Sequence, residues 1–253
     1  MKVVVLASGS KGNVTFIETK KHKLLLDFGM SITYVKNKLN NINVSLESID
    51  YIFISHVHVD HIKGLPILIK RYQPTICLTE EMFSELPDLE EYNHILVYED
   101  ELILDDIRIE TIKTSHDTTD SRGFIVTSEN ESVVYLTDTG YLNNKHFTKL
   151  KNKEYYLFES NHDIHKLMNG PYPKWLRSRI LSDYGHLSNK DASIYLSKLI
   201  GKNTKRIVLM HLSKENNSEE LALNTIFETF KDHSINFDDI KCARQDEMLE
   251  VQK

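Results

Sequence analysis

Residues 54–61 read Ile54-Ser55-His56-Val57-His58-Val59-Asp60-His61, an apolar strand that runs into the pattern His-x-His-x-Asp-His. Side chains alternate along a strand, so His56 and His58 can point in the same direction at its end. Asp60 and His61 then lie in the following turn, where their side chains can bind at a neighbouring position. Imidazole and carboxylate groups together suit a borderline divalent ion such as Zn²⁺, Mn²⁺ or Fe²⁺. The segment therefore predicts a metal centre rather than core packing.

Three further polar residues each close an apolar run with the character of a strand. His116 follows residues 112–115, Asp138 follows residues 133–137, and His211 follows residues 207–210. Taken singly, each also fits a loop histidine or a helix-capping aspartate. Taken with residues 54–61, they predict one catalytic centre whose ligands come from distant strand ends and which keeps open positions for water and substrate.

The composition describes a chain of 253 residues that is 40% hydrophobic and 27% charged, long enough to bury a large core as one domain. Twelve histidines stand beside only two cysteines, Cys77 and Cys242. Two cysteines exclude a disulfide framework and a cysteine-based zinc site, which favours a reducing compartment. No apolar run approaches the roughly 18 residues that span a bilayer, and the N-terminal residues lack the features of a signal peptide. We therefore expect a cytoplasmic protein that does not bind membranes.

The pattern of short β-rich runs and helical segments predicts two packed sheets flanked by helices. The expected strands cover residues 2–7, 15–19, 23–27, 51–55, 75–78, 95–98, 107–112, 123–128, 132–137, 155–159 and 206–211. The expected helices cover residues 31–39, 61–71, 174–181, 189–200 and 218–231.

The formal net charge of −6, taken alone, argues against a general binder of polyanions. The charge is unevenly distributed, however. Residues 79–110 contain twelve acidic residues and one basic residue, Arg108, so this stretch carries −11 and the rest of the chain +5. The simplest interpretation of the stretch is a solvated helix and hairpin with no partner. Its location relative to the metal centre therefore matters more than the net charge.

The motifs together resemble the metallo-β-lactamase superfamily. The resemblance rests on the His-x-His-x-Asp-His segment, on His116 and His211, and on the turn Thr137-Asp138-Thr139-Gly140. It implies an α/β (α+β) fold, the four-layer αβ/βα sandwich, as a single domain over residues 1–253. The segment Leu25-Leu26-Asp27-Phe28-Gly29 resembles the same superfamily, in which such an aspartate supports the ligands from behind.

The resemblance also implies two divalent metal ions and the side chains that hold them. Zn²⁺ is the favoured metal, with Mn²⁺ or Fe²⁺ as alternatives. One ion is expected on His56, His58 and His116, and the other on Asp60, His61 and His211. Asp138 is expected to bridge the two.

Four longer motifs narrow the resemblance to the YycJ (WalJ) family of bacterial metallo-hydrolases. They cover residues 8–13, 159–163, 183–189 and 211–217, which spreads them over nearly the whole chain. The family is associated with nuclease action on DNA. The resemblance therefore implies a dinuclear phosphodiesterase, an exonuclease that cuts DNA through a metal-bound hydroxide. Asp60 is placed to orient that hydroxide as well as to bind metal.

His186 is the candidate for protonating the leaving oxygen of the substrate. It lies in Tyr184-Gly185-His186-Leu187-Ser188, between Asp138 and His211, an order that resembles the phosphodiesterase branch that includes transfer-RNA 3′ processing enzymes. Glu159, at the end of an expected strand, is placed to orient His186. The alternative is that His186 is only part of a helix cap.

Residues 172–179 form the clearest basic stretch with interleaved aromatic residues. Lys174, Arg177 and Arg179 are the candidates for neutralising phosphates, and the aromatic side chains can stack on exposed bases. For the aromatic residues alone, an amphipathic helix with Trp175 packed in the core is the favoured interpretation.

Three small polar residues complete the candidate substrate contacts. The glycine-rich residues 8–13 lack the spacing of a nucleotide-binding P-loop. We expect them to form a hairpin near the site that contributes Ser10 or Asn13. Ser188 can cap the helix that follows His186, so that N–H groups of the helix start face a phosphate.

Two other functions stay open at this point. A thioesterase or lactonase of the glyoxalase II type would use the same metal cluster on smaller acyl substrates, and the basic stretch argues moderately against it. A metal-bound regulator without turnover belongs to another class, but such proteins usually lose one or more ligands, whereas all seven positions are filled here.

Overall fold

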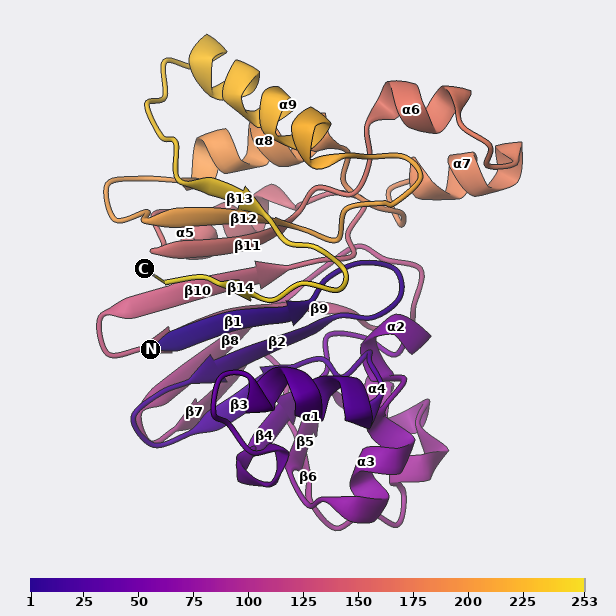
Figure 1. The fold of residues 1–253 in the computed structure, drawn as a ribbon, viewed down its shortest axis with the longest axis vertical. Helices are drawn as coiled ribbons and strands as arrows, with labels where there is room; N and C mark the ends of the chain where they lie inside the picture. The colour runs from indigo at the N-terminus through magenta and orange to yellow at the C-terminus, as the bar shows by residue number, and fades with distance from the viewer. Residues whose placement is uncertain (253) are drawn as a thin grey trace.

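The computed structural model describes residues 1–252, and two mixed β-sheets of seven strands each make up its centre (Figure 1). The first sheet has the strand order β14-β1-β2-β3-β4-β5-β6. Its strands are β1 (Lys2–Ala7), β2 (Val14–Glu18), β3 (Lys23–Leu26), β4 (Tyr51–Phe53), β5 (Thr75–Leu78), β6 (Ile95–Val97) and β14 (Leu249–Glu250).

The second sheet is built from strands within residues 101–242 and has the order β13-β12-β11-β10-β9-β8-β7. Its strands are β7 (Glu101–Leu104), β8 (Ile107–Lys113), β9 (Arg122–Ser128), β10 (Glu131–Leu136), β11 (Tyr155–Glu159), β12 (Arg206–Met210) and β13 (Ile240–Cys242).

Helices cover the outer faces of both sheets (Figure 1). The first sheet carries α1 (Ile32–Asn40), α2 (Val59–Ile62), α3 (Leu65–Arg71) and α4 (Glu80–Ser84), with the short 3-10 turns η1 (Leu46–Ser48) and η2 (Pro87–Leu89). The second sheet carries α5 (Phe147–Leu150), α8 (Asn189–Leu199) and α9 (Glu219–Asp232), with η3 (Asn144–His146). Within residues 1–252, none of the helices is long and apolar enough to cross a membrane.

Three separate apolar layers hold the four structural layers together. One lies between the two sheets and includes Phe53 and Phe124, whose rings meet edge to face. A second lies between the first sheet and its helices, and a third, around Tyr156, lies between the second sheet and its helices. Because each sheet is buried on both faces, strands such as β11 and β12 are buried along their whole length. The predicted αβ/βα sandwich is confirmed.

The strands β3 to β6 are parallel to one another, and so are β10 to β13. Their carboxyl ends reach one edge of the molecule, where α2 lies and where α6 (Ile164–Asn169) and α7 (Lys174–Ile180) project (Figure 1). In open sheets this edge is where ligands bind.

The helix predicted over residues 61–71 is in fact two helices, α2 and α3, separated at Gly64. A Cβ atom at Gly64 would lie 2.3 Å from the carbonyl oxygen of Met30 and 2.5 Å from the ring of Phe28. The chain therefore turns there to pack against residues 28–30, and the next helix begins at Leu65 with Pro66 in its first turn.

Candidate metal centre

Seven histidine and aspartate side chains from both halves of the chain meet at this edge, in groups whose ligand atoms lie within 4.8 Å of one another. One group is His56, His58 and His116, and another is Asp60, His61 and His211. Asp138 is close to members of both groups. Its carboxylate lies within 4.8 Å of ligand atoms of His56 and His61, and within 4.8 Å of a ligand atom of His211. The structure thus brings together every side chain that the sequence predicts as a metal ligand.

The start of α2 is held in place by two backbone loops that pack against it. The N–H of Asn13 donates to the carbonyl of Asp60 at 2.8 Å, and the N–H of Phe28 donates to that of His61 at 2.7 Å. A Cβ atom at Gly29 would lie only 1.7 Å from the carbonyl oxygen of Asp60. Glycine is therefore required at position 29, because only its backbone can approach the helix this closely.

Three residues of the site leave their strands in the left-handed region of backbone conformation. The φ angles of Asp27, Asp138 and His211 are 62°, 57° and 55°. Aspartate and histidine enter this region more readily than most residues, although it costs free energy. At each of these residues the backbone turns away from the preceding strand, directly after the point where the side chain reaches the centre.

Asp27 is fully buried and anchors the cluster from behind. Its carboxylate accepts hydrogen bonds from the N–H and Oγ of Ser55 at 2.8 and 2.9 Å and from the hydroxyl of Tyr135 at 2.9 Å. It also lies 2.7 Å from Nδ1 of His61. This contact fixes the ring so that Nε2 of His61 faces Asp138 at 3.2 Å.

Burial and the neighbouring charges shift the pKa values of the cluster in opposite directions. Burial, with the nearby His61, holds the pKa of His56 well below its usual range, so His56 is neutral, as a metal ligand must be. Burial alone would lower the pKa of His211, but Asp138 and a hydrogen bond with Asp60 outweigh it and raise the pKa to about 9. Burial would raise the pKa of Asp138, but His211 and His61 hold it well below the usual range.

His186 reaches the cluster from the loop before α8. Its Nδ1 lies 2.7 Å from Oε1 of Glu159 and 3.6 Å from Oδ1 of Asp138. The other oxygen of Glu159 accepts the N–H groups of Thr139 and Leu187 at 3.0 and 3.2 Å, so the buried carboxylate is fixed on both sides. The carboxylate of Glu159 and the ring of His186 are therefore in hydrogen-bond contact.

A cavity of about 230 Å³ opens over the cluster and is lined by Ser10, Tyr172 and Arg179 among others. Arg179 is held there by Asp117, with 2.5 Å between Nε and the carboxylate. The same carboxylate lies 3.8 Å from Nε2 of His58 and 3.6 Å from that of His116. Asp117 was not singled out from the sequence, although it directly follows His116.

The other predicted substrate contacts lie elsewhere. The side chain of Asn13 is buried and reaches Nε2 of His61 at 3.0 Å, so it supports the cluster instead of facing substrate. Ser188 is buried as the N-cap of α8, where its Oγ accepts from the N–H of Asp191. Lys174 and Arg177 lie on α7, and neither lines the cavity over the cluster.

The interpretation favoured for the aromatic residues, in which Trp175 packs in the core, is wrong. The Trp175 side chain is 68% exposed on α7. The helix buries only Ile180, so most of its surface is left to solvent. The helix α7, which carries Trp175 and the basic residues Lys174, Arg177 and Arg179, projects from the same edge of the molecule as α2 (Figure 1).

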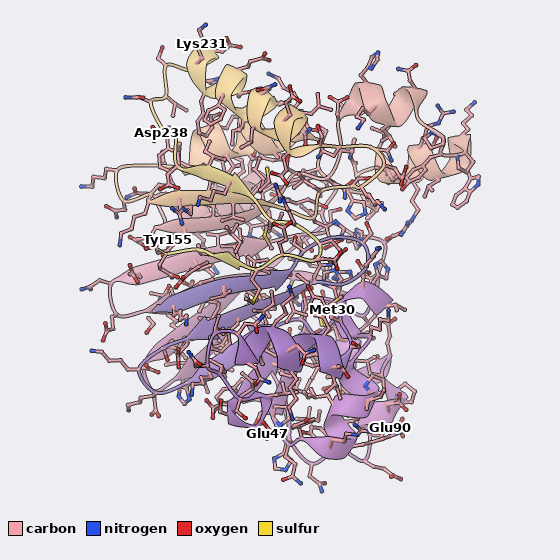
Figure 2. All side chains as sticks on the ribbon, viewed as in Figure 1. Met30, Glu47, Glu90, Tyr155, Lys231 and Asp238 are labelled. Carbon is pink, nitrogen blue, oxygen red and sulfur yellow. The ribbon has the colours of Figure 1, made fainter. Side chains whose placement is uncertain are left out.

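The acidic residues 79–110 extend away from α7. Figure 2 places Glu90 at the lower end of the molecule, whereas α7 lies at the upper right in the same view of Figure 1. Glu85 is the member of the stretch that comes near the cluster, lining a second opening beside His58 and Asp117. The elements α4, β6 and β7, which belong to this stretch, likewise lie in the lower part of the molecule in Figure 1.

The donor set fits divalent metal ions. It consists of imidazole nitrogens and carboxylate oxygens, which suit borderline divalent ions. The Nε2 atom of His56 is buried and has no hydrogen-bond partner among residues 1–252, although buried polar atoms are rarely left unpaired. A bound ion would satisfy it.

The chain belongs to the metallo-beta-lactamase superfamily, whose family model matches residues 7–211. The His/Asp cluster is typical of the dimetal site of this superfamily. Among curated proteins, the chain is homologous to exodeoxyribonuclease WalJ of Streptococcus pneumoniae, with 38% identity over 89% of this chain and 86% of that protein. It is likewise homologous to exodeoxyribonuclease YycJ of Bacillus anthracis, with 33% identity over 90% of this chain and 88% of that protein.

Two solved structures show the same fold at low sequence identity. The metallo-beta-lactamase fold protein YhfI of Bacillus subtilis has a TM-score of 0.72 at 16% identity, over 98% of this chain and 99% of that one. The short form of human tRNase Z has a TM-score of 0.66 at 16% identity, over all of both chains.

Proposed function

We propose that this chain is a metal-dependent exodeoxyribonuclease, a phosphodiesterase that removes nucleotides from the ends of DNA. The observation that carries the proposal is its identity of 38% and 33% to proteins named exodeoxyribonucleases, over 89% and 90% of its length. The grouping of the predicted ligands around Asp138 supports it.

In this proposal, His56, His58 and His116 would hold one divalent ion, Asp60, His61 and His211 would hold the second, and Asp138 would be shared by both. The favoured metal is Zn²⁺, with Mn²⁺ or Fe²⁺ as alternatives. Two bound ions would supply Lewis acidity and a water molecule of lowered pKa, which makes a nucleophile near neutral pH.

The remaining residues bind the phosphate and handle the proton. Hydrolysis adds water across one P–O bond, so the leaving oxygen must gain a proton. Asp60 orients the attacking water, and His186, steadied by Glu159 at 2.7 Å, donates the proton to the leaving oxygen. Arg179, held by Asp117, binds a free oxygen of the phosphate, and Ser10 lines the same cavity.

We further propose that the chain forms one hydrolase domain and acts in the cytoplasm. The two sheets share one apolar layer, and the centre draws ligands from both halves. Cys77 and Cys242 are both free, as a reducing compartment would allow.

The proposal is tested by assaying the purified protein on three substrates. With Zn²⁺ or Mn²⁺ we expect it to shorten linear DNA from its ends and to hydrolyse bis-p-nitrophenyl phosphate, and we expect a chelator to abolish both activities. Hydrolysis of a thioester without cleavage of DNA would indicate the glyoxalase II type of activity instead. A full complement of two metals with turnover of none of the three would indicate a regulator.

Replacing His186 by alanine is expected to lower the rate of DNA cleavage by about 10²–10⁴-fold, the usual contribution of a positioned acid. The rate of bis-p-nitrophenyl phosphate hydrolysis should fall much less, because 4-nitrophenolate leaves without a proton. The measurement is the ratio of the two losses, together with metal content. Equal losses on both substrates, with fewer than two metals bound, would show that His186 is a ligand and not the acid.

A further inference from the structure

A second cavity, of about 310 Å³, lies directly beside the metal centre and shares His116 with it. Its walls come from the loop after β8, the loop after β10 and the loop before α8. Its volume is at the small end of the range for ligand sites, about 300–1,000 Å³. There is room for one small unit of a substrate next to the reacting atoms.

Two exposed tyrosines face this cavity from adjoining loops. Tyr141 is 41% exposed and Tyr184 is 62% exposed, and both line the cavity. The two loops can touch only because residue 140 is glycine. A Cβ atom at Gly140 would lie 2.3 Å from the backbone of Asp183. Exposed aromatic rings beside a phosphodiesterase centre are platforms on which an unpaired base can stack.

The charged residues of the cavity favour an anion. Lys145 forms no ion pair within residues 1–252, and Lys113 lies 3.5 Å from Oδ1 of Asp120. The other oxygen of Asp120 accepts from Nε of Arg122 at 2.8 Å, and Arg122 in turn lies 3.8 Å from Glu99 and 3.7 Å from Asp100. Among the residues that line the cavity, the two lysines therefore stand beside a single carboxylate, that of Asp120, which leaves the lining with a net positive charge. In addition, Nε2 of His146 is buried there without a hydrogen-bond partner among the described residues.

A different surface, which also borders the metal cavity, is suited to the remaining strand. Arg179 lines that cavity, and together with the exposed Trp175 it belongs to α7, a helix whose surface is largely open to solvent. A long strand can follow such a surface, whereas the small cavity ends after one unit.

We propose that the cavity beside His116 binds the terminal, unpaired nucleotide of the DNA strand, the unit that the cut releases. Its base stacks on Tyr184 and Tyr141, and its phosphate or sugar oxygens face Lys145 and Lys113. The remaining strand leaves the centre over α7. This inference rests on the proposed function, and it explains how a centre of this kind would recognise a chain end.

The test compares KM for a dinucleotide and for a long single strand. Tyr184→Ala is expected to raise KM about tenfold on both substrates, the effect of losing one stacked base, and Tyr184→Phe is expected to restore it. Lys145→Ala should raise KM on both as well. The matched controls are Phe227→Ala, an exposed aromatic residue on α9, and Lys149→Ala, whose side chain faces Glu110.

The outcomes separate this inference from the function on which it rests. If the wild type cuts DNA but Tyr184→Ala and Lys145→Ala leave KM unchanged, the cavity is not a nucleotide site although the function stands. If KM rises on the long strand alone, the cavity binds a distant part of the strand, which also overturns the inference. Failure of the wild type to cut DNA would overturn both. Binding of a deoxynucleoside monophosphate that is weakened by Tyr184→Ala, measured by calorimetry, would support the site directly.

Discussion

Asp138→Asn is expected to reduce DNA cleavage by at least about a thousandfold while the protein stays folded. The carboxylate lies between the two ligand groups, with its oxygens 3.2 Å from Nε2 of His61 and 3.6 Å from Nε2 of His211. Asparagine keeps the shape but removes the charge shared by both groups. Since metal ions supply several kcal/mol of charge stabilisation in a transition state, loss of one ion accounts for an effect of this size.

Metal content and activity, measured on the same sample, check this prediction. We expect fewer than two ions per chain in Asp138→Asn, with a circular dichroism spectrum like that of the wild type. Asp232→Asn, at the end of α9, is the matched control and should leave both quantities unchanged. Two ions with undiminished cleavage in Asp138→Asn would show that Asp138 does not bridge the metals.

Asp27→Ala is expected to cost about 3–5 kcal/mol in the free energy of unfolding of the metal-free protein. The substitution removes a buried carboxylate and leaves its donors without an acceptor, including both groups of Ser55 and the hydroxyl of Tyr135. Unpaired buried donors and the loss of the charged partner of His61 each destabilise the folded state. Because Asp27 also orients His61, metal affinity should fall by about 10–100-fold.

Urea unfolding of the metal-free protein separates the two parts of this prediction. The stability loss should be present without metal, whereas the affinity loss is measured by metal titration at a temperature where the variant is folded. Asp27→Asn keeps the volume and one acceptor oxygen, so its free energy of unfolding should lie between those of Asp27→Ala and the wild type. A metal-free Asp27→Ala protein as stable as the wild type would show that the hydrogen-bond network does not hold the fold.

The ligand cluster could be predicted because each member has a local signal. His56 to His61 form one dense motif, and His116, Asp138 and His211 each follow a strand-like run. Parallel strands then bring such ends to one edge of the molecule, a consequence of topology rather than of any further sequence signal.

Burial of the neighbouring polar residues could not be predicted in this way. Asn13 and Ser188 are polar and lie in motifs near the site, which suggested contact with substrate, but tertiary packing encloses both. Trp175 was misjudged because α7 has only seven residues, and a helix of two turns shows too little periodicity to reveal its buried face.

The four-residue strand β7 was likewise missed. So were the short strands β13 and β14, which contain three and two residues, too few for an alternating pattern. They exist because of partners far away in the sequence, β14 through its antiparallel pairing with β1. Local propensity carries no information about such a pairing.

The meeting of both halves at one centre also governs the order in which the protein can mature during synthesis. The group of Asp60, His61 and His211 lacks a member until residue 211 has left the ribosome, and β1 gains β14 only after residue 250 has. A nascent chain therefore carries an incomplete second metal position for most of its translation. On the proposed function, a product truncated before residue 211 would lack a metal ligand and would be unable to degrade the DNA of the cell that makes it.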